Sequence, residues 1–501
     1  MGVSRVPKVL RVPELRCDRL LLAAVAMVLF LAACSEPATD DAGNNQDDST
    51  DVPATGSDDA DDTGNEDTDD ADASTAAAPA APGESNAPAD TGTTAAPATP
   101  GPSDDGSIVW QHRGEPWFLG TIPSAAVAAD MSAEPIKIGM INQEDTPIGS
   151  FPEVRFAAEA AINWINAELG GVDGRPLEFH WCITPFSPEQ SQVCAQEMVQ
   201  EGVVALVGGI NVMSQAAFPI LEQNGIPVVG GIPAGLTEQR SASSFTFSGG
   251  SSGGLAAFMK HAADNGADKA VIAYGEFDAF EVAAADYGAV VGEYLGLDVK
   301  LVRFPVIAAD FLPVLNQAIE FEADAVVIAA ADSSCVSIMK TFKELEIDAQ
   351  LYLVGACAAD HVIEAADGAN IGVVFNSEGP PNDVDVEGTL FDEATNRYNT
   401  GPAQAAGTVG FRGMMNLYGV LVELGGDHIT SEAIIDQLRQ SVDHESFWGH
   451  PYTCDGQQVP GLPALCAPQQ TLFKMESVGE VEYVSGWIDT AELFAASGAG
   501  Q

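Results

Sequence analysis

The stretch Ile136-Lys137-Ile138-Gly139-Met140-Ile141 begins a long alternation of strand-like and helix-like segments. It reads as a short buried strand, and a segment with helical periodicity at 154–169 follows it and stops at Gly170-Gly171. The alternation continues, with strands expected at 177–182, 203–207 and 227–229 and helices at 188–201 and 214–224. Strands that alternate with helices of this length predict parallel sheets made of βαβ units.

The same pattern starts again after the glycine-rich run Gly249-Gly250-Ser251-Ser252-Gly253-Gly254. We expect helices at 255–265, 282–295, 311–321 and 335–345, and strands at 270–274, 299–304, 325–330 and 351–354. The sequence therefore predicts two doubly wound, Rossmann-like α/β lobes. A ligand site would lie between them, at the loops that follow the strands.

The beginning of the chain has the pattern of an export signal, which we assign to residues 1–33. Five basic residues precede an apolar run at 20–33, and this run is too short to span a hydrocarbon core of roughly 30 Å comfortably. The run ends in Leu31-Ala32-Ala33-Cys34, which resembles the bacterial lipobox. We expect Cys34 to be lipidated and to anchor the protein on the outer face of a membrane in the cell envelope. The alternative is an ordinary secretory signal that is cleaved nearby.

Residues 34–133 are interpreted as a disordered acidic linker. Residues 35–105 contain no Lys or Arg and few large apolar side chains, so they cannot bury enough surface to offset the entropy of ordering. Residues 106–133 are less uniform, since Trp110, Trp117 and Phe118 could dock on the folded part or belong to the linker.

The charge balance excludes one class of partner. The chain holds 73 Asp and Glu against 20 Lys and Arg. A chain this acidic is repelled by nucleic acid, so we expect no nucleic-acid partner.

Eight cysteines are present, and six remain once Cys17 in the signal and Cys34 are set aside. An even number outside the cytoplasm predicts disulfides, although six cysteines allow 15 pairings. Local pairing is favoured because each pair joins neighbouring segments of the pattern. The expected pairs are Cys182/Cys194, Cys335/Cys357 and Cys454/Cys466. Histidines lie near some of these cysteines, but no CxxC spacing or complete ligand set is present, so we expect no metal and no cofactor.

Several motifs in their order resemble the type I periplasmic binding proteins, in particular the leucine/isoleucine/valine-binding-like solute receptors of ABC transporters. They are Ile136-Lys-Ile-Gly139, Asn166-Ala-Glu-Leu-Gly-Gly-Val-Asp-Gly-Arg-Pro176, Gly202-Val-Val-Ala-Leu-Val-Gly-Gly209 and Gly225-Ile-Pro-Val-Val-Gly-Gly231. The resemblance covers about 135–490 and implies two lobes joined by a hinge of three crossovers, near 249–252, 376–380 and 448–451. Lobe 1 would comprise 134–250 and 379–449, and lobe 2 would comprise 251–378 and 450–492.

The resemblance also implies where a ligand binds. In the family, a hydroxyl and backbone N–H groups in the loop after the third strand hold the ligand carboxylate, which maps onto Ile210 to Ser214. The residues expected at the site from lobe 1 are Asn211, Val212, Met213, Ser214, Ile232 and Ala234. Phe277 and Phe280 are candidates to cover the ligand, although either could be core. Ser214 could equally serve only as a helix cap.

An amino-acid ligand needs a carboxylate for its ammonium group, because a buried unpaired ammonium is costly. The family's acidic position in lobe 2 corresponds to Cys357, which we assign to a disulfide, and the expected tyrosine is replaced by Ala331. The remaining candidates are Asp332, Glu276, Asp278 and, in the first loop, Glu144. An amino acid is the expected ligand, and an amide, a carboxylate or another small polar solute is the alternative.

These expectations describe a monomeric receptor that captures a small solute and delivers it to an ABC transporter permease. A sensor that signals to a membrane partner is the alternative, because the two-lobed fold serves both uses. An enzyme is not expected. The string Gly249-Gly250-Ser251-Ser252-Gly253 matches GxSxG, but no later histidine has a context that marks it as a base.

Overall fold

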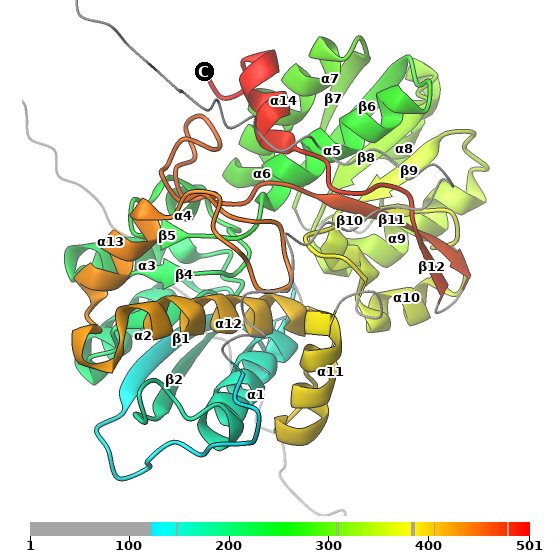
Figure 1. Ribbon diagram of the computed structural model, residues 1–501. Coiled ribbons are helices and arrows are strands. Elements are labelled where there is room, and N and C mark those ends of the chain that lie inside the picture. The colour runs from blue at the N-terminus through cyan, green and yellow to red at the C-terminus, as the bar shows by residue number, and fades with distance from the viewer. Residues whose placement is uncertain are drawn as a thin grey trace, which may run out of the picture. The chain divides into compact units, whose positions relative to one another are not determined.

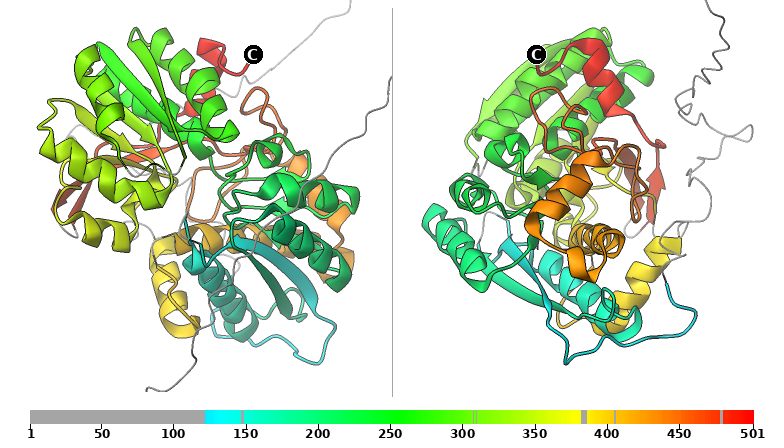
Figure 2. Two further views of the ribbon diagram at one scale, coloured as in Figure 1. Left: turned by 180° about the vertical axis from the view of Figure 1, so that it is seen from behind. Right: turned by 60° about the vertical axis from the view of Figure 1, so that its left-hand side comes forward.

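The computed structural model describes residues 122–146, 149–306, 308, 310–381, 386–404, 406–477 and 480–501, with only the backbone for Asp332. The predicted signal 1–33, the lipidation site Cys34 and the linker up to residue 121 lie outside the described residues. Two separate sheets organise the described part of the chain (Figures 1 and 2).

The first sheet belongs to lobe 1 and is parallel throughout, in the order β2-β1-β3-β4-β5. Its strands are β1 Ile136–Gln143, β2 Leu177–Thr184, β3 Ala205–Val207, β4 Val228–Val229 and β5 Ser244–Phe245. The helices are α1 Pro152–Glu168, α2 Pro188–Glu201, α3 Ser214–Gln223, α4 Leu236–Arg240, α11 Val386–Tyr398, α12 Gly407–Leu424 and α13 Ser431–Gln440. Helix α1 packs against α12 and α11, and α2 packs against α3.

The second sheet belongs to lobe 2 and has the order β12-β11-β10-β9-β8-β6-β7. Its strands are β6 Lys269–Gly275, β7 Asp298–Phe304, β8 Ala325–Ala329, β9 Gln350–Leu353, β10 Val374–Ser377, β11 Thr471–Ser477 and β12 Glu480–Tyr483. Strands β6 to β10 are parallel, and β11 and β12 continue the sheet in antiparallel pairing.

The helical segments of this lobe are α5 Gly250–Asp264, α6 Asp278–Val282, η2 Ala283–Gly288, α7 Ala289–Tyr294, α8 Leu312–Phe321, α9 Asp332–Glu344, η3 Gly355–Ala358, α10 Asp360–Ala366 and α14 Thr490–Ser497. A short 3-10 turn, η4 Gly426–His428, follows α12 in lobe 1. The helix expected at 282–295 begins earlier, at Asp278, and contains the π-helical segment η2.

The apolar runs of the strands fill a core on each face of their sheet. In β1, Ile138 and Met140 belong to the cluster beneath α1 and α12, while Ile141 belongs to the cluster beneath α2 and α3. In β8, Val327 and Ile328 divide in the same way between two clusters of lobe 2. Successive side chains of a strand point to opposite faces, so a strand covered on both faces must be apolar throughout. The predicted fold of two doubly wound lobes is confirmed.

The third crossover lies later in the chain than the sequence led us to expect. We placed it near 448–451, but Tyr452, Cys454 and Cys466 still pack in the core of lobe 1. Between these cysteines the chain makes an excursion, in which Val459 and Leu462 join the core of lobe 2. The chain passes into the second sheet only at β11. Gly449 and Pro451 resemble a linker, and the sequence offers no sign of the buried excursion after it.

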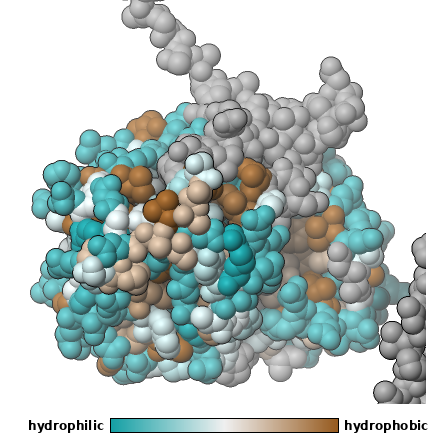
Figure 3. All heavy atoms as spheres, turned by 60° about the horizontal axis from the view of Figure 1, so that its bottom comes forward, coloured by the Kyte–Doolittle hydropathy of each residue, from teal (hydrophilic) through white to brown (hydrophobic). Residues whose placement is uncertain are grey.

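Hydrophilic residues predominate on the face of the molecule shown in Figure 3, and hydrophobic ones occur there in small groups. Across the described residues, no helix combines the length and the apolar character needed to cross a membrane.

Candidate functional site

A cleft with a volume of about 400 Å3 lies between the two sheets. Lobe 1 contributes Ile210, which follows β3, and Ile232, which follows β4. Lobe 2 contributes Phe277 after β6, Ala330 after β8 and Val354 after β9. The carboxyl ends of parallel strands are where α/β folds bind ligands, because side chains of the connecting loops converge there.

Most of the lining is apolar, and aromatic side chains are prominent in it. The aromatic residues are Phe151, Phe186, Phe277, Phe280, Trp448, Phe473 and Tyr483. Phe277 and Phe280 stack edge to face, with ring centroids 5.8 Å apart. Such a surface releases water when an apolar ligand body covers it, at a gain of about 25 cal/mol per Å2.

The charged groups of the lining are Arg412 and Glu378, which form one ion pair. Arg412, from α12, donates from Nη2 to Glu378 Oε2 at 2.6 Å and from Nη1 to the Glu378 backbone oxygen at 2.6 Å. The two side chains are 9% and 11% exposed, so water screens the pair weakly. Sequence reasoning missed both residues.

Glu378 also ties two crossovers together. It lies directly after β10, in the second crossover, and its carboxylate accepts a hydrogen bond from the Ser248 hydroxyl in the first. The third crossover joins them through Asn376, whose Nδ2 donates to Gln470 Oε1 at 2.7 Å. The hinge segments are therefore bonded to one another at the back of the cleft.

The loop after β3 is held mainly by its own polar residues. Asn211 donates to Ser191 Oγ at 2.9 Å and accepts from the Met213 N–H at 3.1 Å, and the Val212 N–H donates to Gln143 Oε1 at 3.4 Å. The N-cap of α3 is Met213, and Ser214 is the first residue of the helix. Asn211 thus fixes the loop that presents Val212 to the cleft.

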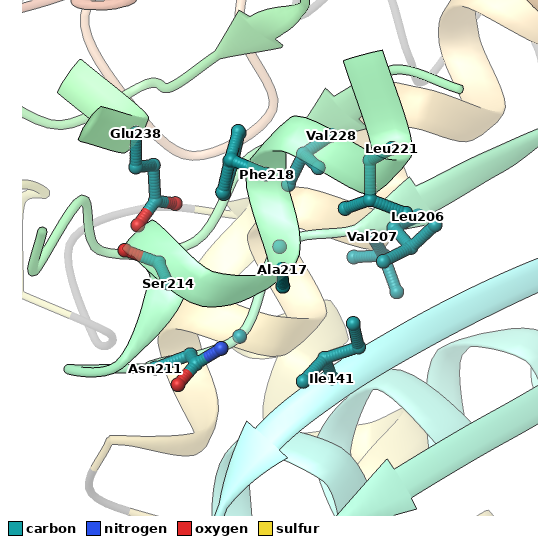
Figure 4. Close-up of a pocket in the computed structure, with 12 residues that line it drawn as sticks. Ile141, Leu206, Val207, Asn211, Ser214, Ala217, Phe218, Leu221, Val228 and Glu238 are labelled. Atoms are coloured by element: carbon teal, nitrogen blue, oxygen red, sulfur yellow. The ribbon is translucent and has the colours of Figure 1, made fainter. Parts of the chain in front are cut away.

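Ser214 faces the interior of lobe 1. Together with Asn211 it lines a small inner pocket of about 20 Å3, and in Figure 4 the carboxyl group of Glu238 points toward the Ser214 hydroxyl. Both side chains are buried. Burial raises the pKa of Glu238 to about 8, while the Ser214 hydroxyl and the backbone N–H groups of Gly235 and Ala234 oppose that shift.

The structure divides the residues that we expected at the site into two groups. Those at the cleft are Val212, Ile232, Ala234, Phe277 and Phe280. Those elsewhere are Asn211 and Ser214 at the inner pocket, Met213 at the helix cap, and Glu144. Asp332 begins α9, and its side chain lies outside the described residues.

Glu144 has a partner within lobe 1. Its oxygens accept from Arg155 Nε at 2.7 Å and Nη2 at 2.9 Å, and the Arg155 guanidinium lies over the rings of Phe156 and Trp181. A two-point pair of this kind leaves the carboxylate little capacity to bind a ligand ammonium.

Three disulfides join the cysteines in the local pairs Cys182–Cys194, Cys335–Cys357 and Cys454–Cys466. Cys357 points into the core of lobe 2, while its neighbours in η3, Gly355, Ala356 and Ala358, line the cleft. Among the described residues, no group of three or more His, Cys, Asp or Glu side chains could hold a metal ion.

Comparison with known proteins gives one family and one fold. A family model described as periplasmic binding protein matches residues 135–461. No curated protein matches the sequence.

Three solved structures illustrate the fold. A leucine binding protein, LivK, from Thermotoga maritima has 21% identity and a TM-score of 0.58, with 70% of this chain and 98% of that chain covered. A fatty acid ABC transporter substrate-binding protein from Thermomonospora curvata has 17% identity and a TM-score of 0.60, covering 73% and 96%. A solute binding protein of an ABC transporter from R. palustris, in complex with benzoate, has 16% identity and a TM-score of 0.57, covering 71% and 96%.

Proposed function

Because this chain belongs to the periplasmic binding protein family, as a type I member with a leucine/isoleucine/valine-binding-like fold, we propose that it is an extracytoplasmic receptor that delivers a small solute to an ABC transporter permease. The observation that carries the proposal is the cleft of about 400 Å3, to which both lobes contribute strand-end loops. A ligand that touches both lobes binds the closed arrangement more tightly, so it shifts the population toward closure. The closed form would be the one that a permease recognises.

In this proposal Cys34 carries a lipid, and the acidic residues 34–121 form the tether. The end of the expected linker belongs to lobe 1 instead, because the Val127 and Ala129 N–H groups donate to the backbone oxygens of Glu168 and Asn166, both at 2.8 Å. A tether of this length keeps the receptor near its membrane partner and raises the local concentration of the pair. We expect the intact protein to partition into the detergent phase of a Triton X-114 extract. Cys34→Ala should move it to the aqueous phase, and equal partitioning of the two forms would contradict the anchor.

An amino acid was the ligand class expected from the family. The three solved structures differ in this respect, since one is a leucine binding protein, one belongs to a fatty acid transporter and one is a complex with benzoate. The receptor function is tested by thermal unfolding with a panel of amino acids, amides, carboxylates and apolar solutes. A true ligand binds the folded state only, so at 100 times its Kd it stabilises the protein by about 2.7 kcal/mol and raises the Tm. A panel in which no solute of any class moves the Tm would sink the receptor proposal.

A further inference from the structure

Hydrogen-bond donors gather at one end of the cleft, around Gly379. A guanidinium group has five N–H donors, and the bonds of Arg412 to Glu378 use one on Nη1 and one on Nη2. Within the described part of the chain, the other three are left for another acceptor. A methyl group built on Gly379 would lie 3.2 Å from the backbone oxygen of Trp448, 3.7 Å from Arg412 Nη1 and 3.9 Å from Trp448 Nε1, so both donors border the same space.

Trp448 supplies the second donor. Its side chain lines the cleft, the residue is only 4% exposed, and no described residue accepts a hydrogen bond from its indole N–H. A buried N–H without an acceptor costs about 1–3 kcal/mol, and a ligand oxygen would remove that cost.

The position of the Trp448 ring is enforced by its surroundings. The backbone of Trp448 has a φ of 48°, which is rare for a bulky side chain. The buried carboxylate of Glu387 accepts the Trp448 backbone N–H, and the indole packs on Phe391 with centroids 5.3 Å apart. Strained residues held in this way concentrate at functional sites, because the surroundings must offset the strain.

The charge of the cleft determines what kind of acceptor fits these donors. The positive charge of Arg412 is already neutralised by Glu378 at 2.6 Å. A ligand carboxylate would therefore add an uncompensated negative charge to a buried site, in a chain whose formal net charge is −53. A zwitterion fits no better, because the only lining carboxylate described is that of Glu378, which is occupied by Arg412 and Ser248.

We infer that the cleft selects an uncharged, largely apolar molecule with an oxygen that accepts hydrogen bonds, such as an amide or ester carbonyl. This inference rests on the receptor function proposed above. The oxygen receives the Trp448 indole N–H and a spare N–H of Arg412. The apolar body lies against the phenylalanines contributed by the two lobes.

Three probes that share one ring test this inference: phenylacetamide, phenylacetate and phenylalanine. We expect phenylacetamide to raise the Tm of the full-length protein and to bind by isothermal titration calorimetry, at least ten-fold more tightly than phenylacetate or phenylalanine. Stronger binding of either charged probe overturns the inference and leaves the receptor function standing. If the amide produces no shift, the inference is also wrong, and the receptor function then depends on the wider panel.

Two variants test where the oxygen of the ligand binds. Trp448→Phe keeps a ring and removes only the indole N–H, and it should weaken amide binding about 3- to 10-fold, the value of one neutral hydrogen bond. Gly379→Ala places a methyl group in the space between the donors and should weaken it at least as much. Trp181→Phe is the matched control, because Trp181 is 46% exposed on β2 and does not line the cleft. Unchanged affinity in both Trp448→Phe and Gly379→Ala would contradict the assigned position.

Discussion

Among single residues, the buried ion pair of Arg412 and Glu378 connects several parts of the molecule. Each partner is nearly enclosed, and Glu378 also holds Ser248, so the pair links lobe 1 to two crossovers. A buried ion pair adds little net stability when compared with apolar residues of the same shape. Removal of one partner is costly, however, because it leaves an uncompensated charge in the interior.

We expect Arg412→Met to lower the free energy of unfolding by about 3–5 kcal/mol, since it leaves the Glu378 carboxylate without its cation. The double variant with Glu378→Gln should recover a large part of that loss. Arg397→Met is the matched control, because Arg397 pairs with Glu168 at 2.5 Å but is 49% exposed, and it should cost at most about 1 kcal/mol. Urea unfolding followed by fluorescence measures all three. Equal losses for the two arginine variants would refute the buried role.

Glu238 gives the protein a pH dependence with a definite sign. Its pKa is raised from 4.5 to about 8 by burial, so the folded state holds a proton that the unfolded state has released across this window. The contribution of this bound proton to the free energy of unfolding is fully present below about pH 4.5. It is lost as the pH rises to about 8, at roughly 1.4 kcal/mol per pH unit. Glu238→Gln should become more stable than the native protein as the pH rises through that window.

The comparison uses denaturant unfolding of both proteins at several pH values between 5 and 9. Glu197→Gln removes an exposed carboxylate from α2 of the same lobe and serves as the control for the change in net charge. A constant difference between Glu238→Gln and the native protein at every pH would contradict the raised pKa.

At the scale of elements, α1 and α12 approach each other closely because α12 carries glycines on the contacting face. A Cβ on Gly410 would lie 1.9 Å from the backbone oxygen of Val154 in α1, which cannot move independently of its helix. Arg412, which lines the cleft, lies on the same helix two residues after Gly410.

We expect Gly410→Ala to destabilise the protein by about 1–3 kcal/mol or more, because the added methyl group forces the two helices apart. Gly413→Ala on the same helix is the matched control. Its new methyl group would lie 3.3 Å from a methyl of Val207, and alanine favours a helix by up to about 1 kcal/mol over glycine. The Tm of each variant measures its loss of stability. A smaller loss of stability for Gly410→Ala than for Gly413→Ala would contradict the close helix contact at Gly410.

The elements that could be predicted from the sequence are those whose structure depends on residues close by in the chain. The apolar run of β1 and the helix stop at Gly170-Gly171 depend on neighbouring residues, and both predicted elements are present. The cleft depends on residues that are distant in sequence. Arg412 is the one basic residue of α12, which indicates a buried partner, but nothing local identifies Glu378. The φ of Trp448 and the excursion between Cys454 and Cys466 are likewise set by tertiary packing.

At the scale of the whole molecule, self-repulsion opposes folding. The chain holds 73 acidic against 20 basic residues, and folding brings those outside the linker closer together than they are in the unfolded chain. We expect the Tm to rise by several degrees between about 0.03 M and 0.5 M ionic strength, where the Debye length falls below 10 Å. Sodium chloride and sodium sulfate should act equally at equal ionic strength if screening is the cause. A Tm that does not change with the NaCl concentration would contradict the role of self-repulsion.

The position of β11 has a consequence for biosynthesis. Strand β11, at Thr471–Ser477, lies between β10 and β12, and the core of lobe 1 needs segments as late as Cys466. Neither lobe can be completed until its late segments have been translated, up to Cys466 for lobe 1 and β11 for lobe 2. A ribosome that stalls before residue 471 therefore releases a chain whose β10 is an unpaired edge, open to association with other chains. A paired edge at β10 therefore requires a message that is translated through residue 477.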